Sequence, residues 1–229
     1  SDKTNENLKT GMSKEWVLKE MIHEDSYNLP RHYVFYYNHR RSVDSIQVSG
    51  NANYTYKVYY KGSKIDSVTL VQNGVIQSVN TNFQYKGNTI SYYDYYCRIC
   101  GQQTPNTYLF NYDHKKKIIS IEKDGNPYMQ LTYDNYNNVI QWNSTSQSSF
   151  TYDNYLNPLY YINNLFAIFV EEPFIWYYAF SQHNSTSRSY AGGTTIFYQN
   201  EYNTSGQLVT KSFNDPQENG QNTYSFLYN

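Results

Sequence analysis

Short stretches in which hydrophobic and polar residues alternate fill most of this chain. The alternation is clearest between 54 and 60, where one face would carry Tyr54, Tyr56, Val58 and Tyr60. Successive side chains of a strand point to opposite faces, so this pattern predicts a strand with one aromatic face and one face in water. No long helical period is convincing, and the segment from Lys14 to Ile22 also alternates and is predicted to be a strand.

Tyrosines that precede a polar turn and then an aliphatic residue recur along the chain. In three copies the aliphatic residue comes six positions after the tyrosine, namely Tyr112 with Ile118, Tyr133 with Val139 and Tyr202 with Leu208. We name these strand-ending residues the anchor tyrosines, and they are Tyr37, Tyr60, Tyr85, Tyr112, Tyr133, Tyr152, Tyr202 and Tyr228. An earlier, degenerate copy is expected at 23–30. A typical interval of about 19–27 residues fits a hairpin of two strands with two short turns.

This repeat predicts an all-β fold. We expect a sequential antiparallel meander of about sixteen strands, built from repeated hairpins and curled or barrel-like so that it hides its aromatic face. Residues 1–12 are polar and are expected to form a flexible leader, as if a targeting segment had been removed. Residues 13–229 are expected to form a single repeat-built β domain, since one β domain often reaches ~200–250 residues.

The interval between Tyr152 and Tyr202 spans 50 residues and breaks the repeat. We interpret it as an apolar insertion at about 158–193, in which the apolar segment Leu165 to Phe180 precedes a polar loop from Gln182 to Gly193. Apolar segments of this kind must be buried against something. We therefore predict a plug on the concave side of the sheet, packed through Phe166, Phe169, Phe174, Ile175 and Trp176.

The Tyr-Asp units resemble the YD repeats of Rhs-type and teneurin-type shells, and the whole chain resembles a group of secreted bacterial lipoprotein domains of unknown function with a porin-like fold. The residues that carry the resemblance are Tyr112-Asp113, Tyr133-Asp134-Asn135, Tyr152-Asp153-Asn154 with Asn157-Pro158, and Tyr202 to Leu208. Asn or Lys replaces the Asp in five copies, at Asn38, Lys61, Lys86, Asn203 and Asn229. The resemblance implies a secreted protein, periplasmic or at the outer membrane, with a lipid anchor on the full-length precursor.

Composition narrows the classes of partner. Aromatic residues make up 19% of the chain, with 29 tyrosines, while the mean hydropathy is -0.80 and the net charge is -1. This charge balance predicts no attraction to nucleic acid or anionic lipid. The basic run Lys115-Lys116-Lys117 is interpreted as a solvated turn without a partner. The apolar stretch 154–170 is interrupted by Asn and Pro, so we expect no spanning helix. Charges recur closely in the strands, as at Lys57, Lys61 and Asp66, so we expect no membrane-spanning strands and a soluble domain.

The two cysteines, Cys97 and Cys100, have the spacing of a zinc knuckle or a redox motif. A structural zinc site needs four ligands, and the chain offers no second cysteine pair. Paired cysteines tend to oxidise in secreted proteins, so a local disulfide is expected, with free thiols and metal binding as the alternatives.

Three further groups are candidates for binding or chemistry. Trp176, Tyr177 and Tyr178, together with Trp142, could form an aromatic platform that stacks on sugar rings, with core packing as the alternative. Glu171 and Glu172 are acids in the apolar insertion, where burial could turn a carboxyl into a general acid, and an exposed turn is the alternative. The recurring Asp113, Asp134 and Asp153 are interpreted as turn-forming residues, with calcium binding as the alternative.

These observations favour a non-catalytic binding or scaffold domain of the cell envelope or surface, with a glycan or another envelope protein as its partner. We expect no enzymatic activity, no cofactor and no metal. The alternative is a hydrolase of polysaccharide or peptidoglycan whose carboxylates are brought together only by the fold.

Overall fold

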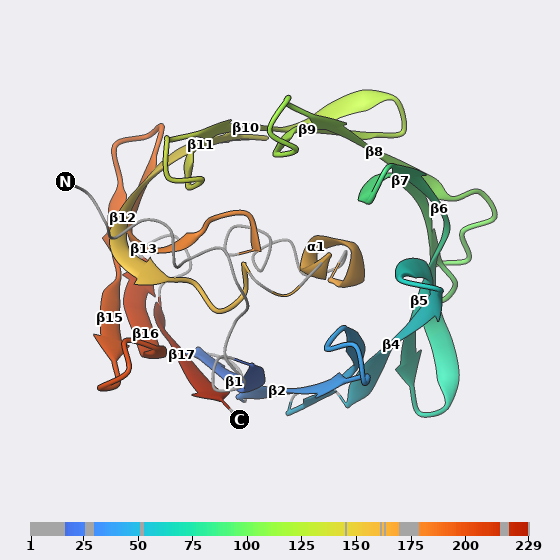
Figure 1. The fold of residues 1–229 in the computed structure, drawn as a ribbon, viewed down its shortest axis with the longest axis horizontal. Coiled ribbons are helices and arrows are strands. Elements are labelled where there is room, and N and C mark those ends of the chain that lie inside the picture. The colour runs from blue at the N-terminus through green and yellow to red at the C-terminus, as the bar shows by residue number, and fades with distance from the viewer. Residues whose placement is uncertain are drawn as a thin grey trace.

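The computed structural model shows a ring of antiparallel strands, viewed end-on in Figure 1. It describes the residues 17–25, 30–50, 53–144, 146–160, 162, 164–169, 179–215 and 220–228. The strands in this part of the chain are β1 (Leu18–Asp25), β2 (Arg31–Tyr37), β3 (Val43–Ser49), β4 (Tyr54–Lys61), β5 (Lys64–Gln72), β6 (Val75–Lys86), β7 (Thr89–Cys97), β8 (Asn106–Tyr112), β9 (Ile118–Lys123), β10 (Asn126–Tyr133), β11 (Val139–Asn143), β12 (Gln147–Leu156), β13 (His183–Tyr190), β14 (Thr195–Phe197), β15 (Gln199–Tyr202), β16 (Leu208–Asp215) and β17 (Gly220–Tyr228).

The strands form one 17-stranded sheet that closes almost completely into a barrel. Neighbours in sequence pair antiparallel from β1 to β14 and from β15 to β17, and β1 also pairs with β17. β14 pairs with β13 and β15 with β16, so the two are halves of one strand bent at Tyr198. Counted as one strand they leave an even number around the ring, which lets the first and last strands meet antiparallel. The predicted all-β meander is thus confirmed.

The anchor tyrosines explain the sequence repeat. The pairing register shifts immediately before seven of them, at Tyr37, Tyr60, Tyr85, Tyr112, Tyr133, Tyr152 and Tyr202. An irregularity of this kind re-aims the side chain that follows it. Six anchor hydroxyls then donate to a backbone carbonyl in the preceding hairpin unit, in the pairs Tyr37 to Leu18, Tyr60 to Val43, Tyr85 to Ile65, Tyr112 to Ile90, Tyr152 to Val139 and Tyr228 to Leu208.

The carbonyls that accept these bonds belong to the aliphatic residues of the repeat. In these six pairs the accepting residue is a buried aliphatic residue, namely Leu18, Val43, Ile65, Ile90, Val139 or Leu208. One hydrogen bond of this type contributes about 0.5–1.5 kcal/mol. The repeat therefore encodes a series of hydrogen bonds, each of which joins a hairpin unit to the one before it.

Four turns after anchor tyrosines share one geometry. The side-chain Oδ1 of Asn38, Asp113, Asp134 or Asn203 accepts hydrogen bonds from the backbone N–H groups two and four residues later. The residue three positions on has a positive φ in each turn, at Arg41, Lys116, Asn137 and Gly206. The contact needs only a side-chain oxygen, so Asn serves as well as Asp. These bonds support the interpretation of Asp113 and Asp134 as turn-forming residues.

The long interval differs from the sequence-based expectation at its end. The predicted polar loop from Gln182 to Gly193 is instead strand β13 followed by a turn, because this polar segment pairs with β12 in an antiparallel ladder. In that turn the Tyr190 N–H donates to the Thr194 carbonyl, and the Gly193 N–H donates to the Tyr190 carbonyl. The four turns described above contain the same pair of backbone hydrogen bonds. The insertion therefore runs between β12 and β13, and it is shorter than predicted.

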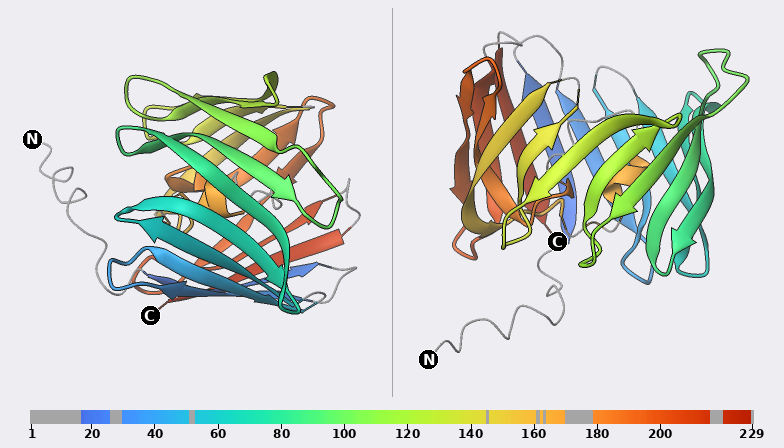
Figure 2. Two further views of the ribbon diagram at one scale, coloured as in Figure 1. Left: turned by 90° about the vertical axis from the view of Figure 1, so that its right-hand side faces the viewer. Right: turned by 90° about the horizontal axis from the view of Figure 1, so that it is seen from above.

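The described part of the insertion lies inside the ring. It contains α1 (Leu165–Ile168), which Figures 1 and 2 show enclosed by the strands. Phe169 is 0% exposed and makes edge contacts with Tyr56 and Tyr33, at ring-centroid distances of 4.9 and 5.9 Å. Asn80 Nδ2 donates to the Ala167 carbonyl at 2.8 Å. These contacts give this segment the position expected of a plug; Phe174, Ile175 and Trp176 lie outside the described residues.

The first strand also differs from the prediction, since β1 begins at Leu18 and continues to Asp25, and Lys14 and Trp16 lie outside the described residues. No helix in the part of the chain that the structure describes has the length and apolar character needed to cross a membrane.

Candidate functional site

Most of the residues proposed from sequence as a ligand platform fall outside the described residues. They are Trp176, Tyr177, Tyr178, Glu171 and Glu172. Trp142 is described and is 3% exposed, with its ring 6.4 Å from that of Phe180. It therefore packs in the core rather than on an exposed platform.

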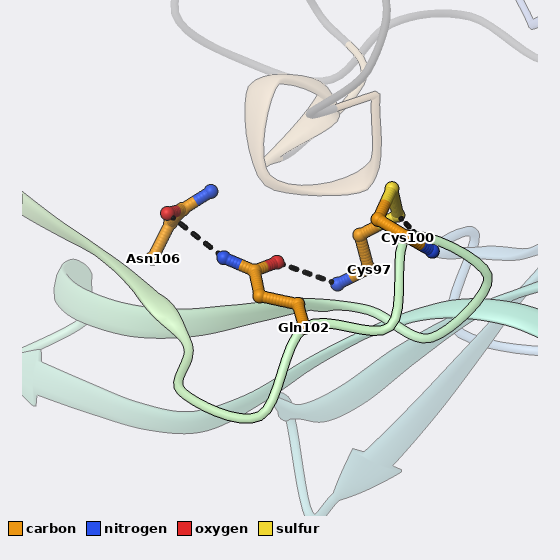
Figure 3. Close-up of a disulfide and its surroundings, with 4 residues drawn as sticks. All are labelled: Cys97, Cys100, Gln102 and Asn106. Atoms are coloured by element: carbon orange, nitrogen blue, oxygen red, sulfur yellow. Dashed lines mark hydrogen bonds between the residues drawn. A yellow bond between two sulfur atoms is a disulfide. The ribbon is translucent and has the colours of Figure 1, made fainter.

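The two cysteines lie where β7 ends, at the end of the barrel opposite the anchor turns, and Figure 3 shows their surroundings. Cys97 and Cys100 form a disulfide across a Cα–Cα distance of 5.3 Å. Gln102 braces the loop, because its Oε1 accepts the Cys97 N–H at 3.1 Å and its Nε2 donates to Asn106 Oδ1 at 3.0 Å. The pair stabilises the loop between β7 and β8.

A polar cluster is buried on the inner side of β13, β15 and β16. Lys211 is 1% exposed, and its amine donates to the Ser185 carbonyl and Oγ at 2.8 and 2.9 Å. Burial lowers the pKa of Lys211 to about 7, although Asp153 opposes the shift. Asp153 accepts hydrogen bonds from Asn200 and Tyr202. The side chains of Ser185 and Lys211 are thus both buried and hydrogen-bonded to each other.

Two carboxylates in the described part of the wall are held by hydrogen bonds from neighbouring side chains. Asp94, which is buried, accepts hydrogen bonds from Asn82 and Tyr92, and Asp153 is held as described above. Within the described ranges, no group of three His, Cys, Asp or Glu side chains is placed to hold a metal ion.

An open groove marks the place where the barrel wall is incomplete. β14 pairs only with β13 in the described ladders, while Phe213, Asn214 and Asp215 of β16 pair with β17. Gln199, the β15 residue next to the bend, pairs with Ser212 of β16, and beyond this pair no described ladder joins β14 to β16. The resulting space, which we name the seam groove, has a volume of about 470 Å³. Its described lining residues are Thr195, Phe197, Gln199, Ser212, Phe213, Asn214, Gly220 and Gln221.

The seam groove combines one exposed aromatic ring with neutral hydrogen-bonding groups. Phe197 is 72% exposed, the largest exposure among the large hydrophobic residues described. Around it lie the amides of Gln199, Asn214 and Gln221 and the hydroxyls of Thr195 and Ser212. None of the described lining residues is charged. Phe213 forms part of the floor, where its ring packs edge-on against Tyr198 at 4.9 Å.

The sequence analysis placed no candidate site here, because the groove residues follow the predicted insertion at about 158–193 and read as further copies of the hairpin repeat. The available signal was the alternation in Thr195-Ile196-Phe197-Tyr198-Gln199, which places Ile196 inward and Phe197 outward. The bend at Tyr198, whose N–H donates to the Thr186 carbonyl at 2.9 Å, depends on long-range pairing that the local sequence does not specify.

Comparison with known proteins gives a similarity at the level of the fold. No protein-family model and no curated protein matches the chain. Among solved structures, a porin-like protein from Bacteroides uniformis ATCC 8492 aligns with a TM-score of 0.63 and 14% identity over 93% of this chain and 98% of that one. A porin-like protein from Bacteroides vulgatus ATCC 8482 aligns with a TM-score of 0.41 and 8% identity over the same shares. The Photorhabdus luminescens Tc holotoxin pore aligns with a TM-score of 0.23 and 11% identity over 85% of this chain and 9% of that one. This chain therefore shares its fold with the Bacteroides uniformis porin-like protein.

Proposed function

We propose that this protein is a non-catalytic, water-facing barrel of the bacterial cell envelope that binds a glycan in the seam groove. The observation that carries the proposal is the exposed ring of Phe197, surrounded by neutral amides and hydroxyls. The apolar face of a sugar ring stacks on an aromatic side chain, and amides and hydroxyls satisfy its many hydroxyl groups. The absence of charge among the described lining residues favours a neutral sugar.

The direction of the side chains supports a scaffold rather than a channel. A transmembrane barrel carries an apolar band outside and a polar interior. Here the buried side chains of the strands include Tyr33, Ile46 and Val58, while charged residues such as Lys57 and Asp66 are exposed on the same wall. The interior also contains α1 and Phe169. We therefore propose that the outer face of the barrel is in water and that the plug occupies its interior.

Two observations support the envelope location. The solved structure with the same fold is described as porin-like. A disulfide such as Cys97–Cys100 persists in oxidising compartments, which include the bacterial periplasm and the cell surface. A secreted protein, periplasmic or held at the outer membrane by a lipid anchor, combines these features.

The test is a calorimetric titration with neutral oligosaccharides of the cello, xylo, manno and malto series. We expect at least one series to bind, and Phe197→Ala to weaken that binding at least tenfold because the stacking surface is lost. Tyr136→Ala is the matched control, since Tyr136 is 70% exposed on an anchor turn and does not line the groove. Failure of every series to bind, or equal affinity in Phe197→Ala, would contradict the proposal.

A further inference from the structure

A second pocket lies between the plug and the rim of the barrel. It opens at the end that carries the anchor turns, where the turns β6–β7, β8–β9 and β10–β11 face α1, and its volume is about 350 Å³. We name it the rim pocket. Ligand pockets of small molecules begin at about 300 Å³, so this pocket has room for a small ligand.

The inner part of the rim pocket is apolar and aromatic. Leu165, Phe166 and Phe180 come from the insertion, while Ile118 and Tyr112 come from the wall. The Phe166 and Phe180 rings are 5.7 Å apart, and Phe166 also packs on Phe110 at 5.2 Å. This floor is held in place by the barrel core, because Phe110 is 3% exposed. An apolar group could enter here without displacing the plug.

The mouth of the same pocket is basic. Lys115, Lys116 and Lys117 all line it, and no acidic side chain is among its described lining residues. The neighbouring Asp113 supplies one negative charge, but its Oδ1 is bound to the N–H groups of Lys115 and Lys117. These bonds fix the turn that presents the lysines. Lys117 Nζ lies 5.0 Å from the centre of the Tyr133 ring, which is also part of the pocket wall.

We infer that the rim pocket binds a small amphiphilic carboxylate, with its apolar body against Phe166 and Phe180 and its carboxylate among the lysines. The three lysines therefore have a partner, which the sequence pattern alone did not indicate. This inference is independent of the glycan proposal. The ligand here has a charged head and an apolar body, whereas the seam groove is proposed to bind a neutral sugar, and the two sites lie at different places on the barrel. It also concerns different strands, since the seam groove involves β14 to β17.

The lysines act mainly through charge, so the probe pair is decanoate and decanol, which share a chain and differ in the anionic head. Calorimetry on the intact chain at low salt should show decanoate binding at least tenfold tighter than decanol. The double variant Lys115→Gln/Lys117→Gln should weaken decanoate binding about tenfold, and added salt should reduce the difference between variant and parent. Both lysines lie on a surface turn, so the fold should survive the change.

Two controls separate this site from general charge effects and from the seam groove. Lys57→Gln/Lys61→Gln removes the same charge from exposed positions of β4 that do not line the pocket, and it should leave decanoate affinity unchanged. Phe197→Ala should also leave it unchanged. No binding of decanoate, equal affinity for decanol, or an equal loss in the Lys57/Lys61 variant would overturn the inference, and none of these results bears on glycan binding.

Discussion

The hydroxyl of Tyr60 donates a 2.8 Å hydrogen bond to the backbone carbonyl of Val43, which lies on the previous hairpin unit. The register of β4 against β5 shifts just before Tyr60, and this shift aims the ring at the neighbouring unit. Similar bonds recur around the barrel, so the tyrosine of the sequence repeat is a connection between units rather than simply a strand former.

Removing one such hydroxyl should lower the stability of the barrel by a measurable amount. We expect Tyr60→Phe to reduce the free energy of unfolding by about 1 kcal/mol, because the Val43 carbonyl loses its donor while the ring packing stays. Tyr59→Phe is the control, since Tyr59 is exposed and should change stability by less than about 0.5 kcal/mol. Urea unfolding of both variants makes the comparison. Equal effects would show that the hydroxyl contact has no special value.

Alkaline pH should unfold the protein for the same reason. Burial raises the pKa of Tyr60 and Tyr85 to about 12, and it raises the pKa of Tyr37 and Tyr228 as well. A raised folded-state pKa stabilises the fold fully below the unfolded value, near 10, and this contribution is lost as pH rises from 10 through the folded value. Each such tyrosine then costs up to about 1.4 kcal/mol per pH unit.

The measurement is a pH titration that follows tyrosinate absorbance and the far-ultraviolet circular dichroism together. We expect the buried tyrosines to ionise in one steep step above pH 10, at the same pH at which the sheet signal is lost. Gradual ionisation of all tyrosines near pH 10 with the sheet intact would disprove the burial of these hydroxyls.

The plug should contribute to the stability of the barrel. Phe169→Ala should reduce the free energy of unfolding by about 3–5 kcal/mol, because the change leaves a cavity between Tyr33 and Tyr56. Phe197→Ala removes an equal side chain from an exposed site and should change stability by less than about 0.5 kcal/mol. Differential scanning calorimetry compares the two variants. A Phe169→Ala variant that melts with the parent would mean that the segment is a surface lid.

The sequence predicted the fold because the alternation of its strands, the spacing of its turns and its apolar insertion all indicated the same architecture. Alternation predicted the strands, and the spacing from Tyr112 to Ile118 predicted the turns, whose geometry depends on local groups such as Asp113. The apolar character of Leu165 to Phe180 predicted burial, and the described residues of that segment lie in the barrel. Local periodicity and local hydrogen bonding are visible in a single sequence.

The candidate sites were less accessible because they depend on long-range geometry. The seam groove exists where the bend at Tyr198 separates β14 from β16, and nothing in the neighbouring residues specifies that separation. The rim pocket joins Lys117 to Phe166, which are distant in sequence and meet only because the plug folds back into the ring. Trp142 was a reasonable platform candidate by residue type, but its position on the inner face buries it.

We propose that the barrel, which keeps its apolar side chains inside around the plug, is a water-facing binding scaffold. Flotation of the purified chain with neutral lipid vesicles, in the absence of detergent, tests this most directly. The account predicts that the protein stays folded in the dense, lipid-free fraction and adds no conductance to a planar bilayer. Stable insertion into the vesicles, with ion conductance across the bilayer, would contradict it.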